Sequence, residues 1–365
     1  MPSVSVVITT HNRVQLLQRA IESARQAGSN FELQAGANFE RQAGSNLERH
    51  AGSDLAGSDL SSSDLSGSNL AGAELEIIVV DDCSTDGTPE FCSKLPDIRY
   101  VRLSSNRGLA YARNVGIAES SAEFIAFLDD DDLRLPGSLA KQLRVLQAAD
   151  RTTADPQADD RGTIDPATDH RTAFCYGQAL IGDARRQLPT GEIYPTTLPQ
   201  GDIFWNLLEH NFIPMPSVLA RKSCLLEAGC FNTDLNLIED WDMWLRLSEH
   251  FLVAAVEEPV AIHRKASAES NQMCSNPAEL CKQALRVQQM ALNRPRAQAA
   301  PAAKRRYVRR KFRNRAYEIL MTEATNSIHV GDSKSARANL LDAFRFRPLR
   351  TLASGRLPWL LAPLR

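Results

Sequence analysis

The chain has 365 residues, of which 43% are hydrophobic and 24% charged, and its formal net charge is -2. This composition suits one large or two ordinary globular domains and gives no whole-chain reason to expect a polyanionic partner. Seven dispersed cysteines without a Cys-x-x-Cys pair argue against a disulfide framework or a zinc site and suit a reducing compartment. The absence of a signal-peptide pattern and of any run of 18 apolar residues predicts a soluble or peripheral, cytoplasmic protein.

The amino-terminal residues predict a buried strand followed by a helix. Val4, Val6, Val7 and Ile8 form a β-branched run typical of a parallel strand covered on both faces. The pattern breaks at residues 9–13. Apolar residues then recur at helical spacing and predict a helix over residues 14–26.

Residues 27–75 are repetitive. Three octads beginning AGSNFELQ are followed by five pentads beginning AGSDL. Neither period keeps its Phe or Leu residues on one face of a helix or a strand. The pentads resemble the A(D/N)LXX units of pentapeptide-repeat solenoids, which form a right-handed β-helix. The Gly/Ser-rich composition favours a weakly ordered surface insertion, and a small interaction module stays open.

Strands and helices alternate again after the repeats. Strands are predicted at 76–80, 98–101, 124–128 and 174–180. Helices are predicted up to about Leu95, capped by Thr88 or Asp86, and over 109–118. Residues 149–172 are polar and predict an exposed loop. This α/β alternation implies a Rossmann-like, mostly parallel sheet flanked by helices. From about residue 277 the pattern predicts a helical carboxy-terminal extension.

Acidic or polar clusters follow three predicted strands. They are Thr9–Asn12, Asp81–Asp82 and Asp129–Asp132. Ligands of parallel α/β sheets bind outside the carboxyl ends of the strands, so these clusters should converge. Four consecutive aspartates require something positive beside them, which a divalent cation with oxygen ligands would supply. A solvated acidic turn, or a run of helix caps, explains the aspartates equally well when they are taken alone.

Four ordered segments over residues 3–139 together resemble glycosyltransferase family 2. They are VSVVITTHNR, EIIVVDDCSTDGT, NRGLAYARNVGI and EFIAFLDDDDLRLPGSL. The resemblance implies a GT-A fold over residues 1–270, interrupted by the insertion, with a basic helical region over 277–365. It implies an inverting, metal-assisted transfer of a sugar from a nucleotide-diphosphate donor. The acceptor would be a glycan or a lipid-linked group, as in cell-surface polysaccharide biosynthesis.

The same resemblance assigns the donor side of the site. It implies that Thr9, Asn12 and Asp82 hold the nucleotide, that Arg113 lies near the diphosphate, and that the family's DXD motif falls on Asp129-Asp130-Asp131. Asp131 is the expected ligand of Mn²⁺ or Mg²⁺, and Asp129 the expected ribose or metal partner. Asp130 is expected among the nucleotide-binding residues. Asp132 is expected to cap or to face solvent.

The acceptor side rests on a second motif. Residues 238–246, IEDWDMWLR, resemble the family's ED motif at the start of a helix. The carboxylate that takes the proton from the acceptor hydroxyl is expected to be Asp240, with Glu239 and Asp242 as alternatives. By composition alone, the motif reads equally well as an acidic helix start with core tryptophans.

Three further residues belong to this acceptor-side assignment. Trp241 is expected to stack on a sugar or the acceptor, and Trp244 to be core. Asn211 begins a stretch that resembles the acceptor-pocket loop. His263 precedes Arg264, whereas many relatives carry the histidine after the arginine, so a structural role is favoured for His263 over a metal or phosphate contact.

The carboxy-terminal region is strongly basic. Residues 294–365 hold 17 Lys and Arg against 4 Asp and Glu. Anionic phospholipid, a solvated helix face and nucleic acid all remain open as explanations. The apolar residues 357–364 favour a membrane-interface anchor, and no recognition motif supports nucleic acid.

Two other classes of function are weighed against the transferase. A nucleotidyltransferase or methyltransferase would need a glycine-rich turn after the first strand, where this chain has THNRVQ. The other alternative is a catalytically idle nucleotide-sugar-binding protein, or one that acts through its repeats. The retained Asp82, Asp131 and Asp240 argue against it.

Overall fold

The computed structural model describes residues 4–28, 74–153, 169–183, 188–264 and 277–354. The predicted repeat insertion (27–75), with its pentad units, lies outside the described residues except at its two ends. Residues 154–168 of the predicted loop and the apolar segment 357–364 also lie outside it.

The described amino-terminal half alternates strands and helices as the sequence predicts. Its elements are β1 (Val4–Thr10), α1 (Val14–Gly28), β2 (Leu75–Asp81), α3 (Thr88–Cys92), β3 (Arg99–Arg102), α4 (Leu109–Glu119), β4 (Phe124–Asp129), β5 (Leu133–Arg134) and α5 (Ser138–Thr153). Helix α3 ends at Cys92, three residues before the predicted end. Its N-cap residue is Gly87, and the carboxylate of the preceding Asp86 accepts the N–H of Thr88 at 3.0 Å.

The second half adds further strands and a helical segment. Its elements are β6 (Asp169–Gly182), β7 (Pro189–Tyr194), α6 (Phe204–Leu207), the 3₁₀ helix η1 (Met215–Ser217), β8 (Val218–Arg221), α7 (Lys222–Glu227), α8 (Glu239–His250), β9 (Phe251–Arg264), α9 (Pro277–Leu292), α10 (Pro295–Ala299), α11 (Ala302–His329), α12 (Ser333–Phe346) and α13 (Pro348–Ala353). The predicted exposed loop 149–172 is wrong at both ends, because residues 149–153 complete α5 and β6 begins at residue 169.

The strands form one mixed sheet in the order β3-β2-β1-β4-β8-β6-β9-β5, with β7 beside β6. The pairs among β3, β2, β1 and β4 are parallel, as expected, and so is β6 with β9. Strand β8 runs antiparallel to both β4 and β6, and β5 and β7 are antiparallel to their partners. The sheet is therefore mostly parallel only in its amino-terminal half.

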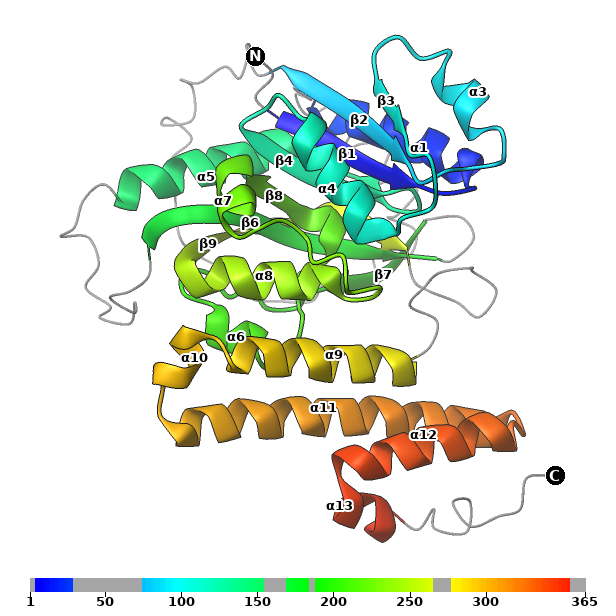
Figure 1. Cartoon of the computed structure of the whole chain (residues 1–365), viewed down its shortest axis with the longest axis vertical. Helices are drawn as coiled ribbons and strands as arrows, with labels where there is room; N and C mark the ends of the chain where they lie inside the picture. Colours follow the sequence, from blue (N-terminus) through cyan, green and yellow to red (C-terminus); the bar gives the residue numbers. More distant parts are fainter. Residues whose placement is uncertain (1–3, 29–73, 154–168, 184–187, 265–276, 355–365) are drawn as a thin grey trace, which may run out of the picture.

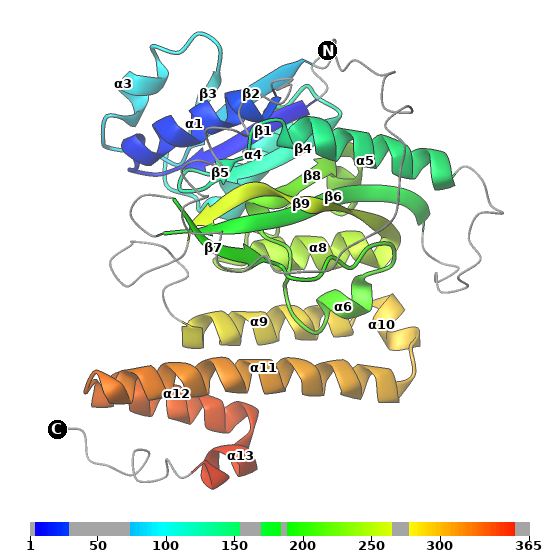
Figure 2. The ribbon, with the colours of Figure 1, turned by 180° about the vertical axis from the view of Figure 1, so that it is seen from behind.

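Helices cover both faces of the sheet (Figures 1 and 2). Successive side chains of a strand point to opposite faces. In β1, Val6 and Ile8 pack with α1 and α5, while Val7 packs on the other face in the cluster that includes α4 and α8. The β-branched run of the first strand is thus buried on both sides.

The carboxy-terminal helices continue the second of these cores. Helix α9 lies along α8, α11 lies along α9, and α12 packs on α11 (Figure 1). One buried apolar cluster runs from Val7 of β1 to Phe346 of α12. In the described parts of the chain, no helix is both long and apolar enough to cross a membrane.

Candidate active site at the carboxyl edge of the sheet

The three polar clusters predicted from the sequence meet at one edge of the sheet. Strand register pairs Thr10 with Asp81 across β1 and β2, and Thr9 with Asp129 across β1 and β4. The carboxyl ends of the three strands are therefore side by side. This geometry confirms the predicted convergence of Thr9–Asn12, Asp81–Asp82 and Asp129–Asp132.

Asp82 organises the turn that precedes α4. Its carboxylate accepts the backbone N–H of Arg107 at 2.6 Å and that of Gly108 at 2.8 Å. Gly108 has φ = +84°, a conformation that side chains disfavour. Its neighbour Asp81 is buried and accepts from Ser84 N–H and from the Tyr100 hydroxyl. Asp82 thus fixes the loop at the rim of the site.

The residues after β1 are held by the loop after β2. Asn12 has φ = +55°, and its Oδ1 accepts the N–H groups of Thr85 at 2.7 Å and Asp86 at 3.3 Å. The hydroxyl of Thr9 donates to Asp129 at 3.2 Å. Asn12 remains exposed at the edge, while Thr9 is buried.

Arginines neutralise the run of four aspartates. Arg13 Nη1 lies 3.1 Å from oxygens of both Asp130 and Asp131, and Arg264 Nη2 donates to Asp131 at 2.7 Å. Asp130 also accepts from the Thr10 hydroxyl at 2.8 Å. Burial, partly opposed by the charge of Arg13, raises the pKa of Asp130 to about 7. The sequence predicts a positive partner here, but neither arginine is among the predicted site residues, although Arg13 stands in the THNR segment.

Asp132 differs from its prediction. Its residue is 1% exposed, and its carboxylate accepts the backbone N–H of Arg264 at 2.8 Å and contacts His263 Nδ1 at 3.1 Å. It neither faces solvent nor caps a helix, but ties the end of β4 to the end of β9. His263 thus has a protein partner at Nδ1, while 44% of its side chain is exposed. Although burial lowers the pKa of His263, the Asp132 charge raises it to about 9.

Arg113 joins the carboxyl edge of the sheet to the start of α8. Its Nη2 lies 2.7 and 3.0 Å from the two oxygens of Asp129, and its Nη1 donates to Glu239 at 2.5 Å. Helix α4 can bring this side chain close because Gly116 packs directly on β1, where a Cβ would lie 2.2 Å from a methyl of Val7. The bridge makes Glu239 a partner of Arg113, a role that the sequence did not reveal.

Asp240 lies beside this bridge at the start of α8. It accepts from Asn211 Nδ2 at 3.1 Å and from the Trp241 N–H at 2.6 Å. Burial and the charge of Glu239 raise its pKa to about 6, against the opposing effect of Arg113. Such a carboxylate is ionised at neutral pH and basic enough to accept a proton. The preceding residue, Ile238, has φ = +56°, a rare conformation for a β-branched residue.

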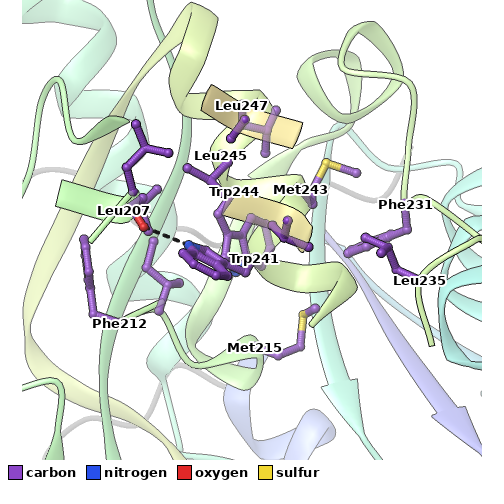
Figure 3. Close-up of a cluster of buried hydrophobic side chains, with 14 of the residues drawn as sticks. Leu207, Phe212, Met215, Phe231, Leu235, Trp241, Met243, Trp244, Leu245 and Leu247 are labelled. Atoms are coloured by element: carbon purple, nitrogen blue, oxygen red, sulfur yellow. Dashed lines mark hydrogen bonds between the residues drawn. The ribbon is translucent and has the colours of Figure 1, made fainter. Parts of the chain in front are cut away.

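Trp241 is placed in the core instead of in an open pocket (Figure 3). The residue is 2% exposed, and its indole N–H donates to the Leu207 carbonyl at 2.9 Å. Its ring stacks on Phe312 of α11 with centroids 5.8 Å apart. The Trp241 ring therefore has no exposed face on which a sugar could stack in the expected way. Trp244 is buried against Phe174, as expected of a core residue.

The carboxylates at this edge are oxygen donors of the type that Mg²⁺ and Mn²⁺ prefer. Asp129 is the most open member of the run, with 24% of its side chain exposed. Asp131 is buried between two arginines. Within the described residues, no group of three or more His, Cys, Asp or Glu side chains is arranged to enclose a metal ion. The donor atoms fit a metal that also uses ligand oxygens, with Asp129 as the accessible contact.

The fold is that of GT-A glycosyltransferases. A crystal structure of S. aureus TarS 1-349 in complex with UDP-GlcNAc aligns with 96% of this chain and 83% of that chain, with a TM-score of 0.54 at 16% identity. The TarS 1-349 structure in complex with UDP aligns with a TM-score of 0.51 at 15% identity.

The sequence comparisons agree with this fold. Residues 67–218 match the model of Glycosyl transferase family 2. An uncharacterized glycosyltransferase of Haemophilus influenzae is 28% identical over 53% of this chain and 61% of its own length. The succinoglycan biosynthesis protein ExoO of Rhizobium meliloti is 31% identical over 46% of this chain and 45% of its own. This chain thus spans less than two thirds of each relative, and the matches confirm the predicted resemblance to family 2.

Proposed function

We propose that this chain is a glycosyltransferase that moves a sugar from a nucleotide-diphosphate donor to an acceptor hydroxyl, with Asp240 as the base. The Arg113 bridge is the observation that carries the proposal. It ties Asp129 at the donor edge to Glu239, the neighbour of Asp240. One buried cation thereby sets the distance between the two halves of the site.

The donor is assigned to the edge formed by β1, β2 and β4. Thr9, Asn12 and Asp82 lie there and would hold the nucleoside, with Asp129 and Asp130 beside them. The relation to TarS, crystallised with UDP and with UDP-GlcNAc, supports a nucleotide-sugar donor. Mn²⁺ or Mg²⁺ would be held by Asp129 and Asp131, and when bound it would neutralise charge on the diphosphate.

The protein's own groups divide the work of the transfer. Asp240 would take the proton of the acceptor hydroxyl as its oxygen attacks the anomeric carbon, from the face opposite the leaving diphosphate. That geometry inverts the anomeric centre. Arg113 would contribute positive charge on the side where the leaving group becomes more negative. Asn211 would orient Asp240 through its 3.1 Å hydrogen bond.

The acceptor is proposed to be a glycan or lipid-linked group of the cell surface, a class consistent with the likeness to ExoO. Its modification at the cytoplasmic face of a membrane would explain a basic carboxy-terminal region. Exposed cations of α11, including Lys311 and Arg315, would then contact anionic lipid.

Calorimetric titration with UDP, GDP, CDP and dTDP, with and without Mn²⁺, tests the donor assignment. Metal-dependent binding of one nucleotide is expected in the wild type and should be lost in Asp131→Ala. Asp234→Ala is the matched control, because it removes an exposed aspartate of the loop before α8. Circular dichroism verifies that each variant is folded.

Asp240→Asn separates binding from turnover. This variant should bind the nucleotide like the wild type but transfer the sugar at least about 10²-fold more slowly. If a folded wild-type protein binds none of the four nucleotides, the proposal is refuted, and an interaction protein becomes the better description.

A further inference from the structure

A cavity of about 400 Å³ lies between α9 and α11, away from the donor edge. It is lined by Leu285, Gln288, Gln289, Asn293, Arg309 and Arg313. Both helices belong to the lower layers of Figure 1. The volume is within the range of small-ligand sites.

The two charged residues that line the cavity are both positive. Arg309 and Arg313 are four residues apart on α11, so they are neighbours on the helix, where like charges repel. Residues 302–317 contain eight Lys and Arg and no acidic residue. Neither arginine makes an ion pair or hydrogen bond within the part of the chain that the structure describes. Folding alone therefore gives no reason for a cationic pair at this position.

Other cations of the same helix do have structural partners. Lys304 lies 4.3 Å from the ring centre of Trp205, and Arg305 donates to the Gln298 carbonyl at 2.7 Å. Both contacts attach the first turns of α11 to neighbouring elements. Arg309 and Arg313 differ from these two residues, because their guanidinium groups face a cavity.

Amide side chains complete the lining. Gln288 is buried, and its Nε2 donates to the Leu208 carbonyl at 2.8 Å, so this wall is fixed to the catalytic half. Gln289 in the last turn of α9 and Asn293 directly after the helix are exposed and can donate further hydrogen bonds. Two guanidinium groups with amide donors suit phosphate, because arginine binds its oxygens in pairs.

We propose that the cavity between α9 and α11 binds a phosphate-bearing group at a site separate from the nucleotide-sugar. The group belongs to a soluble phosphate or diphosphate compound, or to the head group of an anionic lipid. Arg313 follows Phe312, whose ring stacks on Trp241. The bound phosphate would therefore lie one packed layer from the start of α8, which carries Asp240.

The test compares two double variants of α11 with equal charge change and equal spacing. Arg309→Gln with Arg313→Gln removes the cavity pair. Arg306→Gln with Arg310→Gln is the control, since these arginines are exposed on the same helix but do not line the cavity. All four positions are on the surface, and thermal unfolding verifies that both proteins are folded.

Pyrophosphate is the soluble probe, titrated by calorimetry at fixed ionic strength into protein that already contains saturating UDP. Losing charged hydrogen bonds should weaken binding on the order of tenfold or more in the cavity variant, and less than about twofold in the control. Vesicles of phosphatidylcholine with phosphatidylglycerol form the second arm, measured by sedimentation. A loss specific to the cavity variant in that arm alone identifies a lipid head group.

Equal losses in the two double variants would show unspecific attraction to a basic surface and overturn the proposal, as would no binding of either probe. UDP titration of the cavity variant keeps the two proposals distinct. Its UDP affinity should equal that of the wild type. If the chain does not bind UDP, the comparison of the two double variants still decides the outcome at the cavity.

Discussion

Replacing Asp240 with asparagine should slow turnover strongly and stabilise the protein at neutral pH. Burial and Glu239 raise the pKa of this carboxyl to about 6, from an ordinary value near 4 in the unfolded chain. The folded state therefore favours the protonated form. Below pH 4 the carboxyl has little effect on stability, but as the pH rises from 4 to 6 the wild type loses stability that an uncharged asparagine keeps.

The size of the effect follows from the shift. Two pKa units correspond to about 3 kcal/mol, and replacing the carboxylate also perturbs its hydrogen bond from Asn211, so about 1 to 3 kcal/mol is expected at pH 8. The advantage of the variant should shrink below about 1 kcal/mol at pH 4. Urea unfolding of both proteins across this pH range measures it, with Asp234→Asn as control.

Turnover gives the second readout of the same carboxyl. The wild-type rate should fall below about pH 6 as the base becomes protonated, and Asp240→Asn should be slower by about 10² to 10⁴. A stability difference that does not change with pH would refute the raised pKa. Unchanged turnover in the variant would refute the role of Asp240 as base.

Three other substitutions test the geometry. Arg113→Gln should lower the free energy of unfolding by about 3 to 5 kcal/mol, measured in urea, because it leaves Asp129 and Glu239 without their cation. Asp82→Asn should weaken nucleotide binding about tenfold in calorimetry, since an amide cannot accept both N–H groups of the turn. Trp241→Phe should destabilise by about 1 to 3 kcal/mol by leaving a buried carbonyl unpaired, with the acceptor KM unchanged. A raised acceptor KM without loss of stability would instead support sugar stacking.

Local pattern was sufficient for the amino-terminal half of the fold. The strands at β1, β2 and β4 and the helices α1 and α4 were predicted within two residues at each end, because burial periodicity is a short-range signal. The antiparallel insertion of β8 between β4 and β6 was missed. Strand direction there is decided by pairing between distant segments, which one sequence does not display.

The sequence predicted that the carboxylates lie together, but it did not predict which residues pair with them. Polar residues at strand ends converge by topology alone, so Asp82 and Asp129 could be placed. Arg264 is more than 130 residues from Asp131, and nothing in the local sequence links them. Trp241 was assigned to the acceptor from its motif, whereas its cover, Phe312, comes from a helix that the motif does not contain.

The stack of Trp241 on Phe312 also limits how this protein can be recombined with its relatives. A chimera that exchanged residues 4–264 for those of a relative would pair a foreign helix α8 with the native Phe312. The contact between position 241 and Phe312 in the core would then be mismatched. The two positions should therefore be exchanged together, so α11 should accompany α8 in any chimera.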